Sequence, residues 1–142
     1  MGRNRTFEEP VVVALAARQF LATGYEATSL DDLVLATGLH RGSLYKAFGS
    51  KRGLFLAALR QVAGTGEQPG DLTQNALDLL LVALLELAPV DDEVRDVTHS
   101  LLRRAPSADV PAILGERLVA RARIDLSDPP DDPTIRSPEG TP

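Results

Sequence analysis

The chain has 142 residues, contains no cysteine and carries a formal net charge of −5. Its hydrophobic fraction of 44% is ordinary for a folded protein, which excludes a chain that is disordered throughout. The lack of cysteine excludes a disulfide scaffold, a thiol nucleophile and cysteine-ligated zinc. Residues 1–9 are polar and lead into an amphipathic stretch, so we expect no secretory signal and a cytoplasmic location.

Charge is divided unevenly along the sequence. Residues 1–60 hold eight Lys and Arg against five Asp and Glu, whereas residues 61–142 hold seven against fifteen. From Leu39 to Arg60 there are five basic residues and no acidic one. A short basic stretch in an acidic chain is typical of a surface that faces a polyanion, although a solvated basic face produces the same pattern.

The helical period of apolar residues predicts four helices before residue 64, and no window alternates as a strand would. Hydroxyl and acidic side chains mark the helix starts, and glycines mark the ends. The expected boundaries are a capping box of Thr6 and Glu9 with a stop at Gly24, a start at Thr28–Ser29 with a stop at Gly38, a third helix from His40 to Ala47, and a fourth helix capped by Ser50.

Glycines and a proline at residues 64–70 predict a linker, after which three more helices are expected. The first, opened by a cap at Asp71, contains the run Leu79–Leu85, which is apolar on all sides. Because Asp78 and Glu86 bracket this run, it is far shorter than the ~20 residues of a membrane span, and we expect no membrane partner. We expect this helix and the two after it to form a homodimer interface across a two-fold axis, with the core of a monomer as the alternative for the apolar helix.

These observations predict an all-α protein with three parts. Residues 7–63 form a three-helix helix-turn-helix domain, residues 71–126 form a short helical domain for dimerisation or regulation, and residues 127–142 form a disordered, proline-rich tail. The helices that meet at Gly38 outline the helix-turn-helix, because Leu33 and Leu44 pack them together while the polar residues of the second helix stay outside. Such a helix fits the major groove of DNA.

The residues of this region resemble the DNA-binding region of TetR-type transcriptional regulators. The resemblance covers about residues 7–60, less than half of the chain, and its most specific part is the pattern Gly42-Ser-Leu-Tyr45, Phe48-x-Ser-Lys51, with Gly24-Tyr25-x-x-Thr28 upstream. Family members usually have acidic residues after the Ser-Lys pair, where this chain has Arg52 and Gly53. Gly53 is expected to weaken the helix start by up to ~1 kcal/mol relative to alanine.

The resemblance implies a role for each matching position. Thr28 and Ser29 would contact phosphate at a helix start, Arg41, Gly42 and Ser43 would read bases, Tyr45 and Lys51 would clamp phosphates, and Lys46 would help to select the sequence. His40 and Arg52 complete the set from their polarity and position, Arg52 on the side that faces DNA. For Tyr45 the alternative is an amphipathic core residue.

We therefore expect a sequence-specific DNA-binding regulator, a repressor that binds a palindromic operator in double-stranded DNA as a homodimer and is released by a small-molecule effector. The alternative is a helical protein–protein or small-molecule sensor module that keeps the fold but no longer reads DNA. We expect no enzyme activity and no cofactor, because the sequence shows no set of nucleophile and base. No metal site is expected, since the acidic runs lack the spacing of a calcium loop.

Overall fold

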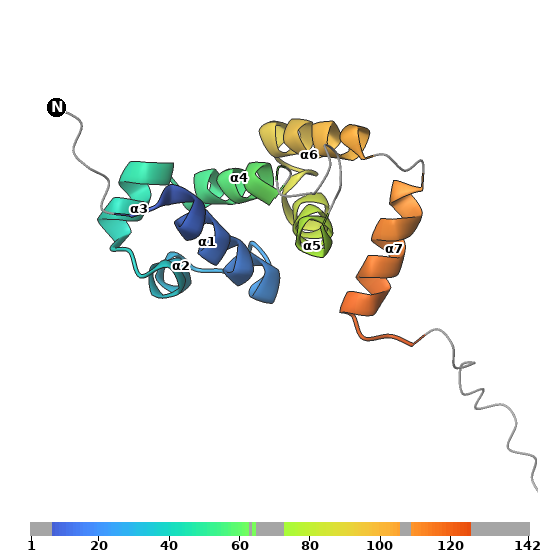
Figure 1. The fold of residues 1–142 in the computed structure, drawn as a ribbon, viewed down its shortest axis with the longest axis horizontal. Helices are drawn as coiled ribbons and strands as arrows, with labels where there is room; N and C mark the ends of the chain where they lie inside the picture. Colours follow the sequence, from blue (N-terminus) through green and yellow to red (C-terminus); the bar gives the residue numbers. More distant parts are fainter. Residues whose placement is uncertain (1–6, 63, 65–72, 106–108, 126–142) are drawn as a thin grey trace, which may run out of the picture.

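The helical periodicity of the sequence becomes seven α-helices and one π-helical segment in the residues that the computed structural model describes, which are 7–62, 64, 73–105 and 109–125. These ranges contain no strand, so the predicted all-α class is confirmed. In chain order the elements are α1 (Glu9–Thr23), α2 (Leu30–Thr37), α3 (Arg41–Phe48), α4 (Lys51–Val62), α5 (Gln74–Val82), the π-helical segment η1 (Ala83–Leu87), α6 (Asp92–Arg104) and α7 (Val110–Arg121) (Figure 1).

Local sequence signals set the ends of the helices near the turn, as predicted. The hydroxyl of Ser29 accepts a hydrogen bond from the backbone N–H of Asp32, whose carboxylate accepts one from the N–H of Ser29. This reciprocal capping box starts α2, and Gly38 ends it in the left-handed conformation with φ of 71°. At the start of α4, the hydroxyl of Ser50 accepts a hydrogen bond of 2.9 Å from the N–H of Gly53.

Two predicted caps are not the ones that the structure shows. Helix α1 begins after Glu8, which makes no side-chain cap, and Thr6 lies outside the described residues. Asp71 also lies outside them, and the hydroxyl of Thr73 caps α5 instead by accepting from the N–H of Ala76 at 3.2 Å. In both cases the N-cap lies two residues later than predicted.

One hydrophobic core runs through both halves of the described chain. The rings of Phe20, Tyr25 and Phe55 pack together with centroids 5.2 to 5.9 Å apart. The same core includes Leu79 and Leu80 of α5, which are fully buried, because α5 packs against α1 and α4. The predicted division at residues 64–70 therefore crosses a continuous core; that division stays a prediction, and the predicted tail lies outside the described residues.

The apolar run in the second half is mostly core. Residues 79–83 are buried inside the chain, since α1, α4 and α7 surround α5. For residues 79–83 the structure thus shows the alternative, a core within the chain, whereas Leu84 is half-buried and Leu85 is 61% exposed. The expected homodimer stays a prediction. Apolar side chains of the last helix are also exposed, among them Ile113 and Leu118.

Candidate nucleic-acid interface

Helices α2 and α3 form the predicted helix-turn-helix. Leu33 of α2 and Leu44 of α3 are buried, and Leu39 in the turn packs against the same core. Helix α3 also packs against α4, which leaves its opposite side free (Figure 1). The turn at Gly38 and the packing of these three leucines thus leave one side of α3 exposed to solvent. The recognition helix of a helix-turn-helix protein is exposed in the same way.

The exposed side of α3 is polar and has no acidic residue. Arg41 and Tyr45 lie one helical turn apart, as do Gly42 and Lys46, so the two pairs share one face. Tyr45 is 49% exposed, and the alternative that it is a core residue is therefore wrong. Of the residues predicted here to contact DNA, His40, Arg41, Gly42, Tyr45 and Lys46 are exposed and Ser43 is half-buried.

The guanidinium of Arg41 pairs with the carboxylate of Asp31 on α2. Both side chains are largely exposed, and an ion pair of this kind contributes little to stability. Arg41 is therefore free to exchange this carboxylate for a phosphate or a base edge. At Gly42 no atom of the chain lies within 4 Å of where a Cβ would be, so packing inside the described protein does not require glycine at this position.

Thr28 and Lys51 hold the loop between α1 and α2. The Thr28 side chain is fully buried, and its hydroxyl donates a hydrogen bond of 2.6 Å to the carbonyl of Gly24. The ammonium of Lys51 donates to the carbonyls of Tyr25 and Thr28 at 3.0 Å each and lies 4.3 Å from the centre of the Tyr25 ring. The predicted phosphate contact of the Thr28 hydroxyl is thus not available in this arrangement, whereas Lys51 keeps one N–H to donate.

Arg52 does not lie where the sequence suggested. Its guanidinium donates two hydrogen bonds to Asp91, at the start of α6, and one of 2.8 Å to Glu93. Arg60 donates a further hydrogen bond of 3.1 Å to Glu93. Asp91 and Glu93 lie 39 and 41 residues after Arg52 in the chain. Only the packing of α4 against α6 therefore shows that Arg52 joins the two halves rather than facing DNA.

The same ion pair predicts how stability depends on pH. Hydrogen bonds from Arg52, and one from the N–H of Val94, lower the pKa of Asp91 from 3.8 to about 2. A lowered pKa in the folded state means that the unfolded chain takes up protons first as the pH falls, so this contribution is complete above about pH 5 and is lost between about pH 4 and 2. We expect Asp91→Asn to unfold at lower denaturant concentration at pH 7 and to show a smaller loss of stability over that acidic range than the parent. Equal acid dependence in denaturant titrations of the two proteins would contradict this assignment.

The contacts of two residues could not be predicted from the sequence, and Gly53 is the first of them. A Cβ at this residue would lie 2.0 Å from the carbonyl oxygen of Phe48, closer than any real contact. The absence of a side chain therefore lets the end of α3 approach the start of α4. The sequence suggested only that glycine weakens a helix, because the contact depends on the angle between two helices.

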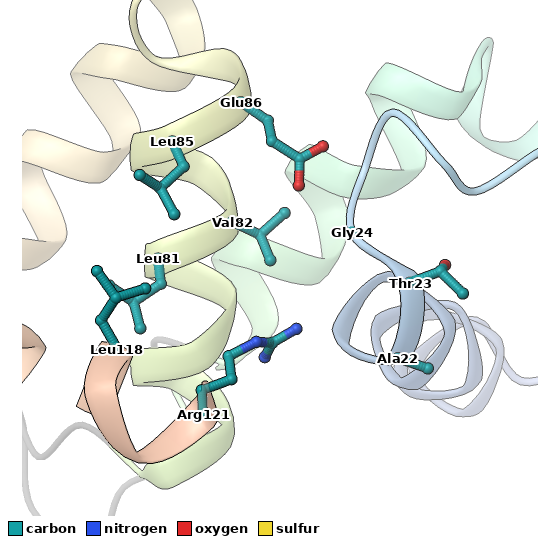
Figure 2. Close-up of a pocket in the computed structure, with 9 residues that line it drawn as sticks. All are labelled: Ala22, Thr23, Gly24, Leu81, Val82, Leu85, Glu86, Leu118 and Arg121. Atoms are coloured by element: carbon teal, nitrogen blue, oxygen red, sulfur yellow. The ribbon is translucent and has the colours of Figure 1, made fainter. Parts of the chain in front are cut away.

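Glu86 is the second missed position, and it borders a cavity of about 220 Å³. Figure 2 shows Glu86 and Arg121 at two ends of an apolar strip that includes Leu81 and Val82, facing the end of α1 at Gly24. A glutamate flanking an apolar run has no sequence signal of its own. Its partner in the α1–α2 loop is 60 residues away, so only the fold brings the two together.

The described ranges contain neither a metal-binding cluster nor a membrane-spanning helix. No three His, Asp or Glu side chains there are grouped so that they could hold a metal ion. None of the helices in those ranges combines the length and the apolar character needed to cross a bilayer. The expected absence of a cofactor stays a prediction.

The capped helix α2, the turn at Gly38 and the exposed helix α3 together define a helix-turn-helix of the kind found in DNA-binding proteins. Residues 12–58 match the family of bacterial regulatory proteins described as the tetR family. The N-terminal region of this chain is therefore similar to that family, and the predicted resemblance is confirmed.

Three relatives each match less than half of the chain. The chain is 47% identical over 60 residues to the uncharacterized HTH-type transcriptional regulator YezE of Bacillus subtilis, covering 42% of this chain and 31% of the relative. It is 47% identical over 58 residues to the HTH-type transcriptional repressor ComR of Escherichia coli, covering 41% and 28%. It is 37% identical over 68 residues to the repressor BdcR of Escherichia coli, covering 48% and 34%. The chain thus spans about a third of the length of these relatives.

Proposed function

We propose that this protein is a sequence-specific DNA-binding transcriptional regulator, a repressor that binds a palindromic operator in double-stranded DNA as a homodimer and is released by a small ligand. One observation supports this above all: the exposed face of α3 is basic and has no acidic residue, and α3 is the second helix of a helix-turn-helix that matches the tetR family. Two of the relatives named above are repressors, which favours repression over activation.

The proposed contacts with DNA follow from exposure and position. Arg41, Ser43 and Lys46 face the major groove and read base edges, and Gly42 allows the backbone to approach the groove. Tyr45 contacts phosphate, and the loop side adds contacts from Ser29, from the remaining N–H of Lys51 and from His40 at the start of the helix. The hydroxyl of Thr28 is left out of this set because it is fully buried, and Arg52 is left out because Asp91 and Glu93 hold its guanidinium. The hydroxyl of Ser29 also bonds within the chain, to Asp32, but Ser29 is exposed and is kept in the set.

A homodimer is proposed because one short recognition helix makes few contacts with DNA. Two recognition helices bound to the two halves of a palindrome make twice as many contacts. The buried run in α5 is not available for this purpose. The exposed apolar side chains Leu85, Ile113 and Leu118 offer an alternative surface on η1 and α7. Sedimentation equilibrium at micromolar concentration measures the oligomeric state directly, and a monomer would contradict the proposed dimer.

Release by a ligand is supported by the cavity between the end of α1, η1 and α7. Its volume of about 220 Å³ lies just below the range of typical ligand pockets, so a small molecule is the size that fits. Its walls combine the apolar side chains of Leu81, Val82, Leu85 and Leu118 with one acidic and one basic side chain, which could orient a ligand (Figure 2).

The decisive experiment is selection of binding sites from random duplex DNA with the purified chain. The proposal expects an approximately palindromic consensus, bound with an affinity that falls steeply as salt rises, because phosphate contacts release counterions. The alternative of a sensor module that no longer reads DNA expects no enrichment. Salt-dependent binding without any consensus would leave only nonspecific association and would contradict sequence-specific regulation.

A further inference from the structure

A single carboxylate from the second half of the chain reaches the loop that precedes the helix-turn-helix. Oε2 of Glu86 accepts a hydrogen bond of 2.7 Å from the backbone N–H of Glu26. Its other oxygen lies against Gly24, where a Cβ would be only 2.6 Å away. Gly24 has φ of +87°, a conformation that suits glycine, and its missing side chain leaves the space that this carboxylate fills.

The loop that Glu86 touches determines where the reading helices lie. The carbonyls of Tyr25 and Thr28 hold the ammonium of Lys51 at the start of α4, and the Thr28 hydroxyl ties back to Gly24. The next residue, Ser29, caps α2. Because α2 packs against α3, a displacement of this loop is passed to the recognition helix through elements that are already in contact.

Glu86 is itself firmly placed by its own element. It belongs to η1, whose wide turn is closed by a hydrogen bond of 2.8 Å from the N–H of Ala88 to the carbonyl of Ala83. Isolated π-helical turns within α-helices occur frequently at functional sites. Helix α5, which leads into η1, is fastened to α7 by hydrogen bonds of 2.7 and 2.8 Å from Arg117 to Asp78.

We propose that Glu86 is a positioning residue for DNA reading, which fixes the α1–α2 loop and thereby the placement of α2 and α3. Glu86 also lines the cavity between α1, η1 and α7 (Figure 2). The same side chain therefore contacts both the cavity and the α1–α2 loop. This inference rests on the proposed function, because a positioning role is defined by what it does to DNA binding.

The first test measures hydrogen exchange of backbone amides in the full chain without DNA. Glu86→Ala removes the acceptor, whereas Glu86→Gln keeps an oxygen that can accept from Glu26. We expect at least about tenfold faster exchange at Glu26 in the alanine variant, with faster exchange also at Leu33 and Leu44, whose amides report on α2 and α3. The glutamine variant should stay close to the parent.

The second test measures affinity for the duplex selected by the parent protein. We expect Glu86→Ala to weaken binding by about 5- to 20-fold and Glu86→Gln by less than about threefold, in the lower part of the range for coupling between sites. Glu116→Ala is the matched control, since it removes the same charge from an exposed position on α7 and should leave affinity unchanged.

The outcomes separate the two proposals. If the parent selects no duplex, the proposed function fails, while the exchange experiment still decides whether Glu86 acts on α2 and α3. Faster exchange confined to Glu26, or full DNA affinity in Glu86→Ala, would overturn the positioning role. An affinity loss in Glu86→Gln as large as in Glu86→Ala would overturn it as well, because the hydrogen bond would then not be the cause.

Discussion

Replacing Arg41 and Tyr45 together with alanine is expected to abolish specific duplex binding while the chain stays folded. Both side chains are exposed, and the only ion pair found for Arg41 within the described residues is the exposed one with Asp31, so their removal costs little stability. A good contact of an arginine with a base is worth about 1–3 kcal/mol of discrimination, and the proposed dimer would lose each contact twice. We therefore expect a loss of affinity of about 100-fold or more in fluorescence anisotropy titrations.

The control is Arg103→Ala, which removes an exposed arginine from α6, away from the helix-turn-helix. It should bind the duplex with nearly the affinity of the parent. Thermal unfolding of the double variant should match that of the parent to within a few degrees. If the double variant is stable and still binds the selected duplex with full affinity, α3 is not the reading helix.

Gly53→Ala is expected to destabilise the protein by about 1–3 kcal/mol, although alanine is the better helix former. The added Cβ would meet the carbonyl oxygen of Phe48 at 2.0 Å, and a backbone atom cannot move aside as the end of a side chain can. The turn between α3 and α4 must therefore open. Chemical denaturation with a two-state fit measures the change.

Gly115→Ala makes the same substitution where space is available. Gly115 lies inside α7, and no atom is found within 4 Å of its missing Cβ. Here the ordinary helix propensity should apply, and we expect an increase in stability of up to about 1 kcal/mol. Equal and positive effects of the two substitutions would show that the close approach at Gly53 does not restrict the protein.

The sequence predicts well those features that depend on neighbouring residues. The capping box at Ser29, the left-handed stop at Gly38 and the Ser50 cap each involve residues no more than four positions apart, and the structure shows all three. The exposed face of α3 was equally predictable, because the period of a helix decides which of its side chains point away from Leu44. Residues 12–58, which match the tetR family model, contain these local signals.

Features that depend on contacts between distant segments were decided by the tertiary structure alone. Arg52 has the charge and place of a DNA contact, yet α6 brings Asp91 and Glu93 to it. Residues 79–83 have the composition of an interface, but the surrounding helices bury them within the chain. Glu86 carries no signal in the sequence, and its hydrogen-bond partner, the N–H of Glu26, lies in a loop 60 residues away. Period and capping act over one or two helical turns, whereas the partners of these residues are chosen by how whole helices pack.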